Sequence, residues 1–171
     1  MPMVEALMNR FDKEKVGFQI GRNVFVPFCG RQFSCVMGLK YVGQHVHPKL
    51  KSTGCLKLAK YFDGQVKNTT RNRILCAMIS IAGKHGKQDD FARLFTLYAF
   101  NCLLFPTANL CLPEYVIQYV DNLVTIRDYA WGKAVHEFLI VALSKRGKYV
   151  NGCTLGLLVS FSRHLLLFGL Y

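Results

Sequence analysis

Apolar residues recur at every third or fourth position through the second half of this 171-residue sequence, as in Tyr115, Tyr119 and Leu123. This is the spacing of one face of an α-helix. Breaking residues delimit the repeats: Gly83 follows one apolar run and Pro106 follows another. We therefore expect this half of the chain to be helical. The helices predicted within a core spanning residues 68–168 cover residues 69–83, 91–105, 113–123, 129–144 and 154–168.

The first part of the chain combines short helices with a β-hairpin. Two apolar triplets, 18–20 and 24–26, flank the turn-forming residues 21–23. Residues 1–15 have apolar side chains at helical spacing and are expected to form one short helix. A second short helix is expected over residues 56–62. The expected fold class is therefore mainly α: a single helical domain of about six helices with a small N-terminal β-hairpin. Within this single domain, 1–171, residues 17–39 hold the hairpin and a Gly-Leu element, residues 40–73 form a basic segment, and residues 68–168 form the helical core.

The single tryptophan, Trp131, stands near the start of one predicted helix. A tryptophan buries a large area, so we expect Trp131 to anchor the core. The neighbouring Gly132 would let a second helix approach closely. Tyr129 and Pro106 are also predicted to have structural roles. The residues expected to share a core with Trp131 are Leu97, Phe100, Leu104, Val120 and Leu139.

The sequence lacks the common motifs of catalysis and metal binding. It has no P-loop, no G-x-S-x-G elbow and no G-x-G-x-x-G after a strand. His45 and His47 form a close pair, but the ligand spacing of a zinc module does not accompany them. His136 and Glu137 are adjacent, and adjacent positions on a helix do not face each other. We therefore predict that the protein is not an enzyme and has neither a metal site nor a cofactor site.

Two apolar stretches raise the question of a membrane span. Residues 94–105 end at Pro106, and residues 155–171 contain Arg163 near their middle. A span needs roughly 20 predominantly apolar residues, and a central charge is strongly penalised. We therefore predict two buried helices and no membrane span. The seven cysteines, an odd number without a tight pattern, favour a reducing compartment.

Positive charge is concentrated in the basic segment. The chain has 22 lysines and arginines against 10 acidic residues, and between residues 40 and 73 eight basic residues accompany one acid, Asp63. Tyr41, Tyr61 and Phe62 are interleaved with these cations. This combination is typical of a surface that neutralises phosphates and stacks bases, although a basic face that only keeps a protein soluble has the same composition. The candidate nucleic-acid-binding residues are Lys49, Lys51, Lys57, Lys60, Lys67, Arg71 and Arg73.

Several short motifs of the second half follow one another in an order found in plant proteins. Phe-Ala-Arg at 91–93, Leu-Leu-Phe-Pro at 103–106, Tyr-Val-Asp-Asn-Leu at 119–123 and Tyr-Ala-Trp-Gly-Lys-Ala at 129–134 resemble the plant mobile domain, also called aminotransferase-like. A related domain, which precedes Ulp1-type protease regions in plant Mutator-like transposons, is similar, and the sequence leaves both families open. The resemblance implies a transposon-derived plant protein of the nucleus, with a role in genome maintenance or transposon silencing. The cysteines leave the cytoplasm open as an alternative location. The family name aminotransferase-like does not imply a transaminase activity for this chain, because no lysine can be assigned as the one that would bind pyridoxal phosphate.

Three functional hypotheses remain at this point. The first is a non-enzymatic module that binds protein partners and nucleic acid. The second is the N-terminal fragment of a transposon-encoded Ulp1-like cysteine protease polyprotein, with the catalytic region missing. The third is a protein of the membrane surface that uses the basic stretch together with the apolar tail.

Overall fold

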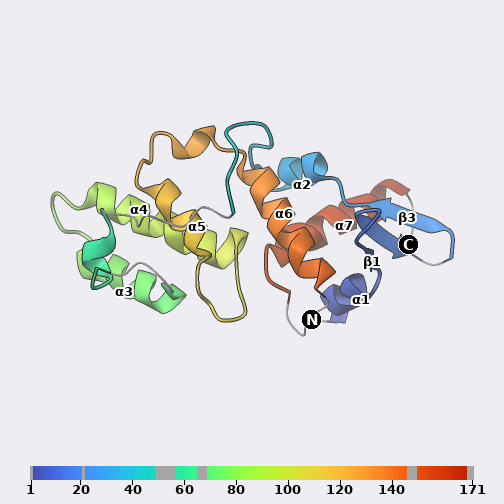
Figure 1. The fold of residues 1–171 in the computed structure, drawn as a ribbon, viewed down its shortest axis with the longest axis horizontal. Coiled ribbons are helices and arrows are strands. Elements are labelled where there is room, and N and C mark those ends of the chain that lie inside the picture. Colours follow the sequence, from blue (N-terminus) through green and yellow to red (C-terminus); the bar gives the residue numbers. More distant parts are fainter. Residues whose placement is uncertain (1, 21, 49–56, 65–68, 146–149, 169–171) are drawn as a thin grey trace. The chain divides into compact units, whose positions relative to one another are not determined.

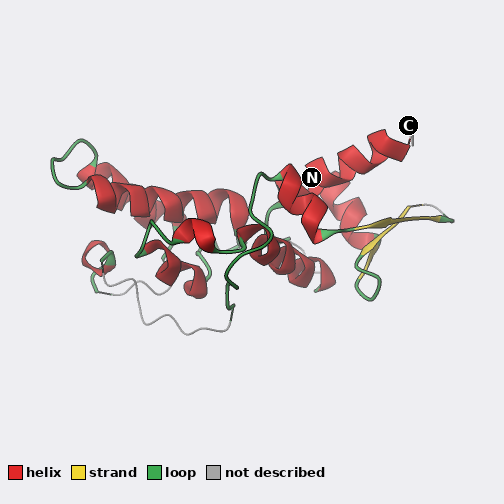
Figure 2. Ribbon diagram, turned by 90° about the horizontal axis from the view of Figure 1, so that it is seen from above, coloured by secondary structure: helices red, strands yellow, loops and turns green. Residues whose placement is uncertain are grey.

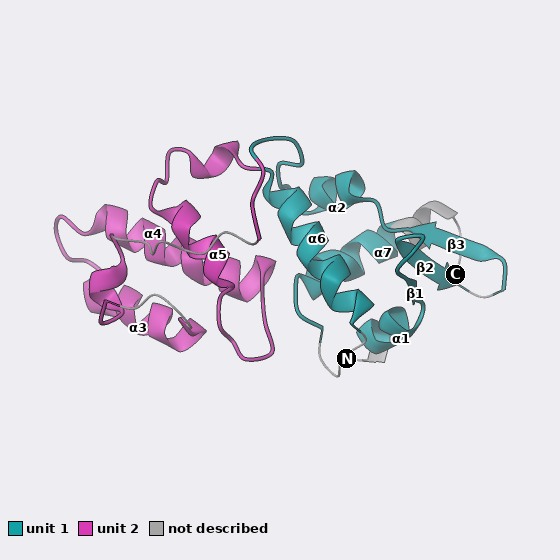
Figure 3. Ribbon diagram, viewed as in Figure 1, with its two compact units in different colours: residues 1–44, 130–171 teal, residues 45–129 magenta. Residues whose placement is uncertain are grey.

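The computed structural model describes residues 2–20, 22–48, 57–64, 69–145 and 150–168. The chain forms two compact units (Figure 1, Figure 3). Unit 1 consists of Met1–Gln44 and Ala130–Tyr171, and unit 2 is the continuous stretch His45–Tyr129. Both ends of the chain therefore contribute to unit 1, and unit 2 is inserted between them.

A three-stranded antiparallel sheet lies near the N-terminus, in unit 1. Its strands follow one another in chain order and are β1 (Phe11–Asp12), β2 (Gly17–Ile20) and β3 (Val24–Pro27). Phe18 pairs with Phe11 on one side and with Val26 on the other, and all three side chains are buried. The predicted hairpin of β2 and β3 is confirmed, and β1 is an additional strand.

The chain turns between β1 and β2, which is why the prediction of one helix over 1–15 is wrong. The helix α1 (Pro2–Asn9) is shorter. After it, the Asp12 carboxylate accepts a hydrogen bond from the backbone N–H of Glu14 at 2.9 Å. An aspartate that binds the backbone two residues further on closes a turn, and Val16 completes the reversal with a left-handed backbone, φ 50°.

Three further helices complete unit 1: α2 (Gly30–Val36), α6 (Trp131–Ser144) and α7 (Thr154–Phe168). Helix α2 packs against both α6 and α7. A Cβ added to Gly132 of α6 would collide with the side chain of Ser34 in α2. The absence of a side chain at Gly132 therefore allows α2 and α6 to pack closely.

Aromatic rings fill the core of unit 1. The Phe18 ring meets Phe28 edge-on, with centroids 5.7 Å apart, and meets Phe161 of α7 at 5.8 Å. Phe28 in turn meets Phe33 of α2 at 5.6 Å. Because edge-to-face pairs add to the free energy of apolar burial, these contacts join the sheet, α2 and α7 around one core.

Unit 2 is built on the helices α3 (Arg71–Ile81) and α4 (Gln88–Ala99), which a short loop joins and which pack against each other. The Thr70 hydroxyl caps α3 by accepting a hydrogen bond from a backbone N–H in its first turn. In the loop, Gly83 and Gly86 both have φ 73°. Glycine adopts this left-handed conformation without a steric penalty, so the two residues allow the chain to reverse.

The end of α4 differs from the prediction of a regular helix over 91–105. Its hydrogen bonding passes into a π-helical turn, η2 (Phe100–Leu104). The backbone N–H of Phe105 donates to the Phe100 carbonyl at 2.7 Å, the i to i−5 bond of such a turn. The helix predicted over 113–123 is also shorter. The remaining helical elements of unit 2 are η1 (Ala59–Tyr61), α5 (Glu114–Ile117), η3 (Gln118–Val120) and η4 (Ile126–Asp128).

The described residues form a mainly helical structure with seven α-helices and one small sheet (Figure 2). The predicted fold class is confirmed at this level, with slightly more helices than six and a third strand. The residues predicted to share one core are buried, but Leu97, Phe100, Leu104 and Val120 belong to unit 2, whereas Trp131 and Leu139 belong to unit 1. None of the helices in the described stretches has the length and apolar character needed to cross a membrane.

Candidate nucleic-acid interface

The basic residues singled out in the sequence all belong to unit 2. Three of the seven lie outside the described residues: Lys49, Lys51 and Lys67. The four whose surroundings the structure describes are Lys57, Lys60, Arg71 and Arg73.

The segment that carries Lys57 and Lys60 is amphipathic. Leu58 and Phe62 are fully buried and anchor the short turn η1 in unit 2. Lys57 and Lys60 flank Leu58 in the sequence and face solvent, and the Lys60 side chain is 53% exposed. Buried apolar neighbours thus fix the backbone from which the two lysines project.

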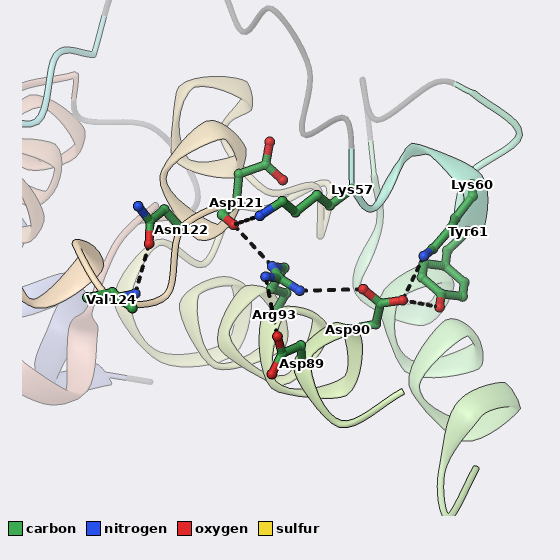
Figure 4. Close-up of polar contacts among 9 residues, drawn as sticks. All are labelled: Lys57, Lys60, Tyr61, Asp89, Asp90, Arg93, Asp121, Asn122 and Val124. Atoms are coloured by element: carbon green, nitrogen blue, oxygen red, sulfur yellow. Dashed lines mark hydrogen bonds and ion pairs between the residues drawn. The ribbon is translucent and has the colours of Figure 1, made fainter. Parts of the chain in front are cut away.

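Asp90, in the first turn of α4, is the centre of a polar cluster (Figure 4). Its carboxylate accepts hydrogen bonds from Lys60 Nζ and from the Tyr61 hydroxyl, both at 2.7 Å, and lies 3.5 Å from Nη1 of Arg93. Burial alone would raise the pKa of Asp90, but the hydrogen bonds from Lys60 and Tyr61 outweigh burial and lower it. Asp90 is therefore ionised at neutral pH and ties the η1 segment to α4.

The same contacts keep the protons on Lys60 and Tyr61. The hydrogen bond to Asp90 raises the pKa of Lys60. Burial, followed by the hydrogen bond to Asp90, raises the pKa of Tyr61. The Lys60 ammonium group also lies 5.1 Å from the centre of the Tyr61 ring, a cation–π distance. Lys60 is therefore a permanent cation at neutral pH, and Tyr61 is a neutral hydrogen-bond donor.

Arg93 connects α4 to the residues after η3. Its side chain is only 10% exposed, and its Nε donates to the backbone carbonyl of Asp121 at 3.1 Å. Its Nη2 lies 3.9 Å from the Asp89 carboxylate. The Asp121 carbonyl also accepts a hydrogen bond from Lys57 Nζ at 3.2 Å (Figure 4). This contact with an uncharged carbonyl is a hydrogen bond that positions the Lys57 ammonium group.

The two arginines in the first turn of α3 differ in their environments. Nη2 of Arg73 lies 3.1 Å from the Asp63 carboxylate, its guanidinium is 5.8 Å from the centre of the Phe62 ring, and its side chain is 41% exposed. Arg71 is half-buried and donates from Nη2 to the Asn101 carbonyl at 3.3 Å. Lys57 and Lys60 are thus linked to Arg93 through Asp121 and Asp90. Arg73 instead contacts Phe62 and Asp63, the residues just after η1, and Arg71 contacts the turn at the end of α4.

Sequence reasoning did not single out Asp90, Arg93 or Asp121. Asp89 and Asp90 precede Arg93 by four and three residues, a spacing that brings opposite charges together on a helix. That signal was present in the sequence. Asp121 contributes its backbone carbonyl, and side-chain type gives no signal for such a role.

The predicted structural residues fall in both units. Trp131 and Gly132 are buried in the first turn of α6 in unit 1. In unit 2, the Tyr129 ring meets Tyr119 edge-on, with centroids 4.7 Å apart. Pro106 is half-buried and follows the π-helical turn, where its lack of an N–H prevents the helix from continuing.

The histidines considered for catalysis or metal binding have separate environments. The rings of His45 and His47 are 4.7 Å apart, and the part of the chain that the structure describes holds no group of three potential metal ligands. His136 is buried in unit 1, where its Nε2 lies 2.9 Å from the Phe28 carbonyl and donates to it. Phe28 and Phe33 contact its ring at 4.6 and 5.7 Å. Burial lowers the pKa of His136, so this ring packs as a neutral group.

The fold and the polar cluster define a mainly helical protein of two units, one with a small antiparallel sheet and one with positioned surface lysines. The chain belongs to the family described as Domain of unknown function (DUF8566), whose sequence model matches residues 1–158. No curated protein and no solved structure matches the chain.

The resemblance to the plant mobile domain, and to the related transposon domain, is therefore wrong. Its most specific element, residues 129–134, includes Trp131 and Ala134, and its Leu-Phe-Pro element includes Phe105; all three are buried. Apolar residues at helical spacing satisfy the packing of any small helical core, so short motifs of this kind arise in unrelated families. The transposon origin, the nuclear silencing role and the protease alternative lose their basis.

Proposed function

We propose that the protein is a non-enzymatic binding module and that unit 2 binds nucleic acid through the phosphate backbone. The observation that carries this proposal is the environment of Lys57. Lys57 is an exposed residue, and its ammonium group is held 3.2 Å from an uncharged oxygen, the Asp121 carbonyl. It is therefore a positioned cation on the surface, as a phosphate contact requires.

Lys60 and Arg73 support the proposal to different degrees. Lys60 is 53% exposed, whereas its partner Asp90 is only 13% exposed, so an approaching phosphate meets the ammonium group before the carboxylate. Arg73 is 41% exposed, but its partner Asp63 is 97% exposed. The Asp63 carboxylate would repel a phosphate, so we expect a smaller contribution from Arg73 than from the two lysines.

The charge of the whole chain determines what kind of binding is expected. A net charge of +12 attracts polyanions over long distances and speeds their association. Contacts from lysines to phosphates do not distinguish one base from another. We therefore expect binding that is weak, tolerant of sequence and steeply dependent on salt. For duplex DNA, a plot of log K against the logarithm of the salt concentration should fall with a slope of about 0.9 for each neutralised phosphate.

The experiment compares two neutralising substitutions, Lys57→Gln and Lys13→Gln, by anisotropy of a labelled DNA duplex over a range of salt concentrations. Lys13 is an exposed lysine of unit 1, so the control changes the net charge equally. A glutamine at 57 keeps a donor that reaches towards the Asp121 carbonyl. We expect Lys57→Gln to weaken binding and to make the salt slope shallower by about one, and Lys13→Gln to leave both nearly unchanged.

Equal effects of the two substitutions would overturn the proposal. They would mean that only the net charge matters and that the basic segment is a solubilising surface, the competing interpretation of the sequence. Urea unfolding of both variants is the control for folding, since an exposed substitution changes the free energy of unfolding by about 0.5 kcal/mol or less.

A further inference from the structure

A different surface of unit 2 exposes large apolar side chains. Ile79 of α3 is 67% exposed, and Phe95 of α4 is 56% exposed. Leu75, Phe91 and Ala99 are half-buried at neighbouring helical positions. These five residues lie on the helical hairpin of α3 and α4 and are called the hairpin face.

Contacts between the helices show which side of α3 carries this face. Arg71 faces α4, since its guanidinium group binds the Asn101 carbonyl just beyond the end of α4. Leu75 and Ile79 follow Arg71 at steps of four residues and therefore lie on the same side of α3, moving gradually outward.

A contact of Phe91 likewise shows which side of α4 carries the hairpin face. Phe91 lines a cavity together with Ile81 and Ala82 at the end of α3, so its side of α4 faces α3. Phe95 and Ala99 follow at steps of four residues. Each helix thus carries an apolar row that begins on the side facing the other helix and turns outward to an exposed residue, Ile79 on α3 and Phe95 on α4.

At the Phe91 end of this face lies the cavity, and its rim carries positive charge. Its volume is about 400 Å³, and its lining combines Ile81 and Phe91 with Lys84, His85 and Lys87 from the loop and the start of α4. Apolar walls with convergent polar groups are typical of binding pockets. The chemistry of the lining selects a ligand that is both apolar and acidic.

We propose that the hairpin face binds an amphipathic helix of a partner protein. The apolar side of that helix lies along Ile79 and Phe95 with one large side chain in the cavity, and its acidic residues face Lys84 and Lys87. An apolar row with anchors every three or four residues is the complement of a helix laid in a groove. The net charge of +12 on each chain disfavours a second copy as the occupant.

The test uses two synthetic helical peptides of about five turns, both with leucines along one face. One has glutamates on the rest of its surface and the other has lysines. Binding to the full chain is measured by anisotropy of the labelled peptide. We expect the acidic peptide to bind and the basic peptide to bind far more weakly.

Two substitutions locate the binding. Phe95→Glu is expected to weaken binding of the acidic peptide by about 30-fold, because a large aromatic anchor dominates an interface of this kind. Val124→Glu is the matched control: Val124 is 70% exposed, belongs to unit 2 and lies outside α3 and α4, and the substitution adds the same charge. It should leave binding unchanged, and circular dichroism should show that both variants are folded.

Several outcomes would overturn the proposal. They are failure of the acidic peptide to bind, equal binding of the two peptides, and equal effects of the two substitutions. A wild-type dimer that Phe95→Glu dissociates would identify a second copy as the occupant instead. Loss of duplex DNA binding in Phe95→Glu would assign the face to nucleic acid. Lys57→Gln should leave peptide binding unaffected, which separates this proposal from the proposed function.

Discussion

At Gly132, helix α6 comes so close to α2 that a side chain does not fit. The nearest atoms to an added Cβ belong to Ser34, so both positions need small residues. Gly156 of α7 has the same property, because a Cβ there would meet the side chains of Met37 and Phe33 at 2.6 and 2.7 Å. Individual small residues thus determine how closely the helices of unit 1 pack.

The buried imidazole of His136 predicts that the stability of the protein depends on pH. Burial holds the pKa of His136 below its ordinary value of 6.5 in the folded state, so the unfolded chain binds the proton more tightly. The stabilisation is complete above about pH 6.5 and is lost as the pH falls through the folded-state pKa. We expect the free energy of unfolding in urea to be lower at about pH 5.5 than at about pH 7.5.

The control variant is His136→Gln, which keeps an amide donor for the Phe28 carbonyl but does not titrate. The nearest charge that affects His136 is Glu137, and it is present in both proteins. The difference in stability between wild type and variant should therefore shrink as the pH is lowered. A difference that stays constant over this range would show that His136 does not contribute to the pH dependence.

Among the elements, η1 depends on side chains far from it in the sequence. A single 3₁₀ turn has too few internal hydrogen bonds to be stable alone. Burial of Leu58 and Phe62 supplies part of its stability, and the link from Lys60 and Tyr61 to Asp90 supplies the rest. The conformation of η1 therefore depends on its contacts with α4.

Asp90→Asn is expected to destabilise the protein by about 1–2 kcal/mol, because the hydrogen bonds from Lys60 and Tyr61 lose the charge of their mostly buried acceptor while Lys60 stays partly in water. Asp89→Asn is the matched control: Asp89 is 86% exposed and 3.9 Å from Arg93, so its removal should cost about 0.5 kcal/mol or less. Urea unfolding measures both values. Equal losses would show that the position of Asp90 in the cluster has no energetic importance.

In the whole molecule, the two units differ in how the chain forms them. Unit 2 is one continuous stretch, whereas unit 1 needs both ends of the chain. Unit 2 also has its own buried residues, among them Ile74, Leu94, Leu97 and Val116. A contiguous stretch with its own core is able to fold as a domain.

We therefore expect a protein consisting of residues 45–129 to fold alone, with a helical circular dichroism spectrum and a cooperative urea transition. Residues 1–44 alone lack α6 and α7 and should not fold. A spectrum of an unfolded chain from residues 45–129 would show that unit 2 depends on the rest of the protein.

Most of the local elements of this protein could be predicted from the sequence alone. The 3.6-residue repeat and the breakers at Gly83 and Pro106 act over a few residues, so the presence of most of the helices and of the hairpin of β2 and β3 could be predicted. The division of the predicted core between two units, the third strand and the π-helical turn could not. The polar cluster joins Lys60 to Asp90 across 30 positions and Lys57 to Asp121 across 64. Only the tertiary structure decided these contacts, because they depend on how distant helices pack and a local pattern of residues carries no information about it.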